Sequence, residues 1–196
     1  MEKRYIIGID QSTQGTKALL FDGEGHLLRR TDLPHRQIVN EKGWVSHDLN
    51  EIYRNTVQTV KTLVAESGVA PEEIAGVGID GQSWSAIAID QEGKVLTNTP
   101  IWMDTRAQSI CDRLNQEIGA DEIFKISGNS LQPSYSTAKI IWYKENLPEV
   151  YEKIDKILQS NSFIAYRLTG AVTQDLSQGY GLHCFDMRTG TWDAQM

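Results

Sequence analysis

YIIGIDQSTQGTKALLFD, residues 5–22, consists of two apolar runs separated by a short polar turn. The first run ends in a single carboxylate, Asp10, and the turn that follows has the sequence QSTQG. Two β-strands joined by such a turn would form a hairpin. Its backbone N–H groups and hydroxyls could bind a phosphate, and the adjacent carboxylate could bind Mg²⁺. From the residues alone, a surface hairpin whose polar side chains satisfy the turn backbone is the alternative interpretation.

Composition limits the classes of function. The chain has 196 residues, 40% of them hydrophobic, enough for one large domain or a small pair. A net charge of −7 argues against a non-specific nucleic-acid binder. The two cysteines, Cys111 and Cys184, are expected to be reduced thiols. The apolar segment in MEKRYIIGID is too short for a secretory signal or a membrane span, which favours a cytoplasmic protein.

The rest of the chain predicts an α/β domain. A third strand over 26–31 would complete an antiparallel meander, and Asp48 is a candidate N-cap for a helix that ends at Gly68. The hydrophobic pattern further predicts short strands and helices: strands over 74–79 and 85–89, extended pieces at 95–96 and 101–102, and helices over 105–117, 136–146 and 162–168.

The whole hairpin string closely resembles the first phosphate-binding hairpin of the FGGY carbohydrate kinases, which belong to the actin, Hsp70 and hexokinase superfamily. Further segments resemble family motifs in the same order: GWVSHDLNEIY (43–53), IDGQSWS (79–85), IWMDTRA (101–107) and LTGAVTQDLSQGYGLHCFDMRTGTWD (168–193). The resemblance implies an actin-like ATPase (ribonuclease H-like) α/β domain. Its mixed sheet would open with the antiparallel meander and be flanked by helices.

The resemblance implies ATP-dependent phosphorylation of a sugar or polyol hydroxyl, with ATP and Mg²⁺ as cofactors. Residues 1–196 resemble the N-terminal domain, so the C-terminal nucleotide-binding domain is expected outside this chain. The family's general-base aspartate lies in a later G-x-x-D-Q/N segment that has no match here. No catalytic base is therefore assigned, and the isolated chain is expected to be inactive. Family members are often dimers or tetramers, so a homodimer is a possible assembly; no nucleic-acid or membrane partner is expected.

The resemblance also implies the residues of the site. Asp10 would bind Mg²⁺, and four residues would bind the phosphates: Ser12, Thr13, Gln14 and Lys17. Five later residues would bind the substrate: Gln82, Ser83, Trp84, Asp104 and Tyr135. An indole such as that of Trp84 is suited to stack on a sugar, while Gln82 and Ser83 can hydrogen-bond its hydroxyls. As alternatives, Trp84 could be a core aromatic, Tyr135 a residue at a helix entry and Asp104 an N-cap.

The residues after Gln82 bear on the substrate. Glycerol kinases carry Arg-Glu at this place and xylulose kinases typically Met-His, whereas this chain carries Ser83 and Trp84. The missing Arg-Glu pair removes the charged clamp that glycerol recognition would imply, and a ketopentose such as xylulose is the favoured substrate, ahead of glycerol or another small polyol. Two other classes stay open: an ATPase chaperone or exopolyphosphatase of the same superfamily, and a non-catalytic sugar-binding protein.

Overall fold

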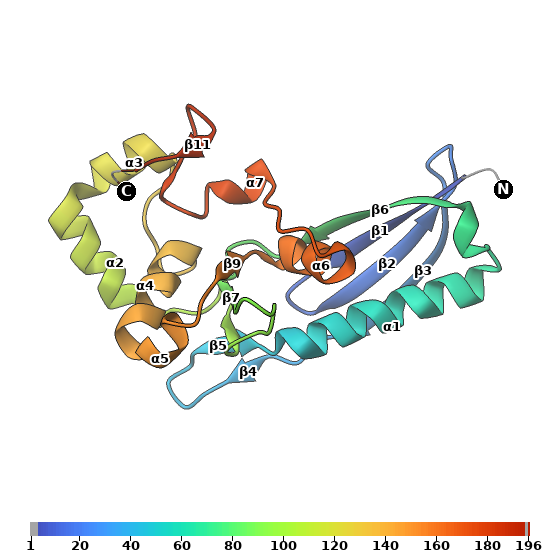
Figure 1. Cartoon of the computed structure of the whole chain (residues 1–196), viewed down its shortest axis with the longest axis horizontal. Helices are drawn as coiled ribbons and strands as arrows, with labels where there is room; N and C mark the ends of the chain where they lie inside the picture. Colours follow the sequence, from blue (N-terminus) through green and yellow to red (C-terminus); the bar gives the residue numbers. More distant parts are fainter. Residues whose placement is uncertain (1–3, 195) are drawn as a thin grey trace.

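The computed structural model describes residues 4–194 and 196. A four-stranded mixed sheet lies at one end of the molecule, in the spatial order β3-β2-β1-β6 (Figure 1). The strands are β1 (Tyr5–Gln11), β2 (Gly15–Phe21), β3 (Leu27–Pro34) and β6 (Ile74–Gly81). β1 pairs antiparallel with β2 and parallel with β6, and β2 pairs antiparallel with β3. The expected antiparallel meander is confirmed, with a third strand that runs on to Pro34.

Helix α1 (Leu49–Ser67) covers one face of this sheet (Figure 1). Its N-cap is Asp48, whose side chain accepts a hydrogen bond from the backbone N–H of Asn50, and it ends at Gly68 in the left-handed conformation (φ 72°). Ile7 and Ile9 of β1 are buried in one cluster with Leu63 of α1. Since side chains alternate along a strand, Asp10 belongs to the opposite face of the sheet.

Shorter strands join the sheet to the rest of the chain. β4 (Ile38–Val39), β5 (Val45–His47) and β8 (Thr99–Pro100) form one small antiparallel sheet, and β7 (Ile87–Ile89) pairs with β9 (Lys156–Leu158). The final pair consists of β10 (Phe185–Asp186) and β11 (Thr191–Trp192). The expected strand over 85–89 thus begins two residues later, and the extended piece expected at 101–102 lies just after β8.

Helices dominate the other end of the molecule (Figure 1). At that end lie α2 (Gln108–Leu114), a π-helical segment (Asn115–Gly119), α3 (Ala120–Ser127), α4 (Ser136–Asn146) and α5 (Pro148–Tyr151). In contrast, α6 (Ser160–Thr169) packs against β6, and α7 (Leu176–Gly179) lies between the two ends (Figure 1). A short 3₁₀ turn, Pro71–Glu73, precedes β6. The helix expected over 136–146 has those bounds. The one expected over 105–117 was wrong at both ends, and α3 was not expected.

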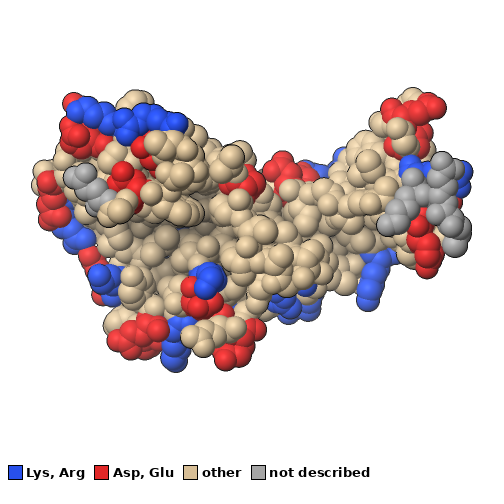
Figure 2. Space-filling view, turned by 45° about the horizontal axis from the view of Figure 1, so that its top comes forward, with Lys and Arg blue, Asp and Glu red and all other residues tan. Residues whose placement is uncertain are grey.

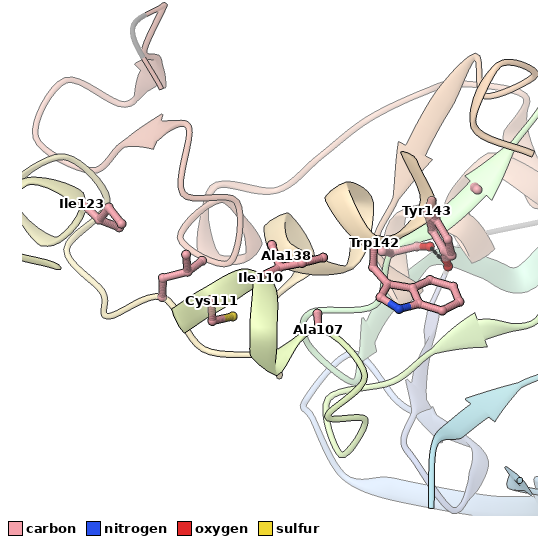
Figure 3. Close-up of a cluster of buried hydrophobic side chains, with 10 residues drawn as sticks. Ala107, Ile110, Cys111, Ile123, Ala138, Trp142 and Tyr143 are labelled. Carbon is pink, nitrogen blue, oxygen red and sulfur yellow. Dashed lines mark hydrogen bonds between the residues drawn. The ribbon is translucent and has the colours of Figure 1, made fainter. Parts of the chain in front are cut away.

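One buried cluster joins these helices, with Ile110 and Cys111 of α2 and Ala138, Trp142 and Tyr143 of α4 among its members (Figure 3). The hydroxyl of Tyr143 donates to the carbonyl of Ala86 at 2.9 Å, which ties α4 to the segment after β6. Cys111 is not disulfide-bonded, as expected, and neither is Cys184. No helix in the described part of the chain has the length and apolar character needed to cross a membrane.

Candidate functional site

A row of charged side chains crosses the sheet at the carboxyl ends of its two parallel strands. Asp10 of β1 and Asp80 of β6 are register partners, and Lys17 of β2 is the partner of Asp10 on the other side. Register partners project from the same face of a sheet. In α/β sheets, ligands bind beyond the carboxyl ends of the strands. This edge is therefore where a binding site is expected.

A pocket of about 340 Å³ opens there. It is lined by Asp10, Ser12, Thr13, Asp80, Gly81, Gln82, Ser83, Trp84 and Trp102. Part of the molecular surface shown in Figure 2 is a broad area of uncharged side chains with Lys, Arg, Asp and Glu gathered toward its edges. The pocket thus brings the turn of the first hairpin together with the loop that follows β6, two segments about 70 residues apart in the chain.

Hydrogen bonds join these segments directly. Trp102 Nε1 donates to Thr13 Oγ1 at 2.9 Å, and that hydroxyl donates to Gln82 Oε1 at 3.1 Å. Gln82 Nε2 donates to His47 Nδ1 at 3.0 Å, since an amide nitrogen can only donate. The two side chains expected to contact phosphate and substrate, Thr13 and Gln82, therefore belong to one connected chain of hydrogen bonds.

His47 supports this chain from a fully buried position. Burial, reinforced by the neighbouring His35, lowers the pKa of His47 from 6.5 to about 4. The ring is neutral at physiological pH, so its Nδ1 can accept the hydrogen bond from Gln82.

Acidification is expected to destabilise the protein through His47. Because the folded pKa is depressed, the unfolded state binds a proton between pH 6.5 and about 4 while the folded state does not. The stability is complete above pH 6.5 and is lost as the pH falls, by roughly 2 kcal/mol at pH 5. Unfolding free energies at pH 7 and pH 5 test this. The loss should shrink in His47→Gln and persist in a control, His26→Gln, whose side chain is exposed; equal losses in both variants would contradict it.

An aromatic wall closes one side of the pocket. The Trp84 ring lies 4.5 Å from that of Tyr135 and 5.8 Å from that of Tyr180, centroid to centroid. Tyr135 is thus in contact with Trp84 but not among the residues that line the pocket. Gln178 Nε2 donates to Ser83 Oγ at 3.2 Å and so holds the loop that follows β6.

The hairpin residues differ in what they offer to a ligand. The Ser12 hydroxyl donates to the carbonyl of Gly15 at 2.9 Å and so closes the turn. A Cβ on Gly15 would lie 2.7 Å from the carbonyl oxygen of Leu33, so only glycine permits this approach of β3. Gln14 is exposed and does not line the pocket. Lys17 Nζ lies 2.7 Å from Asp10 Oδ2 in an ion pair more than one-third exposed, which water weakens and a ligand can rearrange.

Asp104 corrects an expectation. It is fully buried and does not line the pocket, so we no longer assign it to the substrate. Asp104 Oδ2 accepts from the backbone N–H of Val45 at 2.6 Å, and Oδ1 accepts from the backbone N–H of Arg106 at 3.0 Å. The guanidinium of Arg106 contacts both oxygens. The residue holds the turn before α2 against β5, and for this reason α2 begins at Gln108 rather than at 105.

Three contributors were not expected from the sequence. Asp80 and Trp102 line the pocket, and His47 orients Gln82. Trp102 belongs to the same W-x-D segment as Asp104, so its place in that motif was a usable signal, although only the structure shows that its side chain is exposed. Asp80 and His47 lie inside the quoted segments IDGQSWS and GWVSHDLNEIY, but their roles could not be read from these motifs, because they depend on contacts between strands distant in the sequence.

The residues present fit a magnesium ion. Asp10 and Asp80 offer carboxylate oxygens on neighbouring strands, the ligand type that Mg²⁺ prefers. Among the described residues there is no group of three or more His, Cys, Asp or Glu side chains that could hold a metal. Mg²⁺ does not need one, since it is usually held by one or two carboxylates, water and the phosphates of a substrate.

A family model and curated proteins match the sequence of this chain. The model of the FGGY family of carbohydrate kinases, N-terminal domain, matches residues 5–196. A glycerol kinase of Clavibacter michiganensis subsp. michiganensis is 31% identical over 206 residues, a match that covers 100% of this chain and 41% of that protein.

Solved structures of carbohydrate kinases have the same fold as this chain. A ligand-bound xylulose kinase of Lactobacillus acidophilus superposes with a TM-score of 0.90 at 26% identity, covering 97% of this chain and 38% of that one. A Plasmodium falciparum glycerol kinase with ADP superposes with a TM-score of 0.86 at 29% identity, covering 99% and 40%. The expected actin-like α/β fold is confirmed. The chain spans about two fifths of the length of these relatives.

Proposed function

This chain belongs to the FGGY family of carbohydrate kinases, and from that membership we propose that the whole protein transfers the γ-phosphoryl group of ATP to a hydroxyl of a sugar or small polyol. One observation carries the proposal. The hairpin expected to face the phosphates and the loop expected to face the sugar share a single pocket, and Thr13 donates to Gln82 across it. A phosphate-binding turn and a hydroxyl-binding loop in contact are what transfer between the two ligands requires.

The pocket residues divide into two proposed roles. Gln82 and Ser83 would hydrogen-bond the sugar hydroxyls, while the indoles of Trp84 and Trp102 would contact its apolar C–H surfaces. Thr13 would approach the γ-phosphate together with the backbone of the turn. Asp104 has no part in either role.

Phosphoryl transfer depends mainly on positioning and on stabilisation of charge. Asp10 and Asp80 would hold Mg²⁺, whose charge would offset that of the phosphoryl oxygens, and Lys17 would add a positive charge if its pair with Asp10 opens. Removal of the hydroxyl proton requires a general base. We propose that this base and the adenosine pocket belong to the part of the protein outside these residues, and that the protein works in the cytoplasm, where ATP is available.

A ketopentose such as xylulose is the proposed substrate. The support is that Ser83 and Trp84 replace the charged pair expected for glycerol and present an aromatic wall suited to a longer sugar. Glycerol is the second candidate, with an observation of its own: a glycerol kinase is 31% identical over the whole chain.

We expect a ketopentose to stimulate ADP formation by the full-length protein with Mg-ATP at least tenfold over the rate without sugar. The measurement is a panel of ketopentoses, ketohexoses, deoxysugars, pentitols and glycerol. Residues 1–196 alone serve as the control and are expected to be inert with every sugar, since they lack the proposed base.

The other outcomes are equally informative. Stimulation by glycerol alone would replace the ketopentose with the second candidate. ATP hydrolysis indifferent to every sugar would overturn the kinase proposal in favour of an ATPase. Binding of a sugar without any ADP formation would identify a non-catalytic sugar-binding protein.

A further inference from the structure

Trp84 has an unusual backbone conformation. With φ at 67°, it is the one non-glycine residue with positive φ in the described part of the chain. The left-handed region is unfavourable for a bulky side chain and persists only where the surroundings enforce it. The same residue forms the aromatic wall of the pocket. Whatever enforces this conformation therefore also sets the position of the wall.

Lys139 of α4 is the group placed to do so. It is fully buried, and its Nζ donates to the carbonyl of Trp84 at 2.9 Å. The same Nζ donates to the carbonyl of Ser134, the residue before Tyr135. Because the Tyr135 ring packs on the Trp84 ring, one amine holds the backbone at both partners of this aromatic pair.

Packing alone does not account for a lysine at this position. Burial lowers the pKa of Lys139 to about 7, and Asp104 acts in the opposite direction. A buried amine is unfavourable, and an apolar side chain of similar length would avoid this cost. What an apolar side chain cannot do is donate to two carbonyls. Charged or neutral, the amine retains at least two N–H donors, which is enough for both.

The Trp84 ring is also confined from the far side. A Cβ on Gly181 would lie 2.4 Å from Trp84 Cδ1, so the indole packs directly against the backbone there. A change in the peptide at Trp84 therefore cannot shift the ring toward Gly181, whereas the side that lines the pocket is open.

We propose that Lys139 is a positioning residue of the sugar pocket, which acts by holding the left-handed Trp84 and thereby places its indole as the pocket wall. It does not line the pocket itself. The proposal rests on the proposed function in taking the ligand of this pocket to be a sugar. It adds that sugar affinity is set in part from the buried side of α4.

Lys139→Met in the full-length protein tests this. The KM for the sugar is expected to rise at least tenfold, while the KM for ATP stays within about twofold, because only the wall is displaced. Lys144→Met, an exposed lysine on the same helix, is the matched control and should change neither. A uniform loss of activity with an unchanged KM for the sugar would overturn the proposal.

A double-mutant cycle with Trp84→Phe separates positioning from general stability. If Lys139 acts through Trp84, its substitution adds little to the KM for the sugar once the indole is gone. Additive effects would overturn the proposal. Gly181→Ala displaces the same ring without touching Lys139 and should raise the same KM, which tests separately that the position of the Trp84 ring sets the affinity for the sugar.

A spectroscopic readout does not depend on the substrate. The fluorescence of Trp84 is obtained as the difference between the emission of the protein and that of Trp84→Phe. In Lys139→Met, acrylamide should quench this component more strongly, whereas in Lys144→Met the quenching should not change. An unchanged Trp84 component would overturn the positioning role. A changed component in a protein that no sugar stimulates would instead overturn the proposed function and leave the positioning role supported.

Discussion

Replacing Asp104 by alanine is expected to destabilise the protein by about 3–5 kcal/mol, because it leaves a buried guanidinium without its carboxylate. The Arg106 side chain is only 10% exposed, and its guanidinium lies 4.9 Å from the centroid of Trp44 and 4.9 Å from that of Trp142. Two backbone N–H groups, those of Val45 and Arg106, would also lose their acceptor. Urea-induced unfolding of the chain measures the effect.

Matched variants define the origin of this loss. Asp112→Ala, an exposed carboxylate on α2, should change the unfolding free energy by less than about 0.5 kcal/mol. Combining Asp104→Ala with Arg106→Met should cost less than the sum of the two changes, because no charge is then left unpaired. A loss below about 1 kcal/mol for Asp104→Ala would contradict the structural assignment and reopen a role in substrate binding.

Asp10→Asn in the full-length protein is expected to lower kcat with the sugar by on the order of 10²–10³-fold. The amide removes the charge proposed to hold Mg²⁺ beside the γ-phosphate, while the residues proposed to bind the sugar are unchanged, so sugar affinity should be nearly constant. Steady-state kinetics over a range of Mg²⁺ concentrations separate the two effects.

The control for this change is Asp32→Asn. Asp32 is the register partner of Lys17 on β3 and lies in the same row of charges, but it does not line the pocket. Stability should hardly differ between the two variants, since the Asp10–Lys17 pair is more than one-third exposed and worth less than about 1 kcal/mol. A kcat near that of the parent protein for Asp10→Asn would remove Asp10 from the proposed magnesium site.

The elements that were predicted well are those whose signals are local. Alternating apolar residues specified β1 and β2, and Asp48 with Gly68 specified both ends of α1. The elements predicted poorly depend on distant partners. The turn before α2 is set by an ion pair that packs against Trp44 and Trp142, and no pattern within 105–117 reports those contacts.

The candidate site divides in the same way. The residue types at Asp10, Thr13, Gln82 and Trp84 were sufficient to propose them, because a carboxylate, hydroxyl, amide and indole at those motif positions match the chemistry of phosphate and sugar, and all four line one pocket. Asp104 carried an equally suitable carboxylate, yet it is fully buried and paired with Arg106. The residue type determines what a side chain can bind, whereas its burial determines whether a ligand can reach it.

By itself the sequence determined the first hairpin, both ends of α1, the bounds of α4 and the family, since these follow from short-range periodicity, capping and motif order. Only the tertiary structure decided that Asp80 stands beside Asp10, that Thr13 donates to Gln82, and that a buried Lys139 holds Trp84. These contacts join residues about 55 to 70 positions apart. Their formation depends on strand pairing and on the packing of α4, which are properties of the folded chain and not of any segment within it.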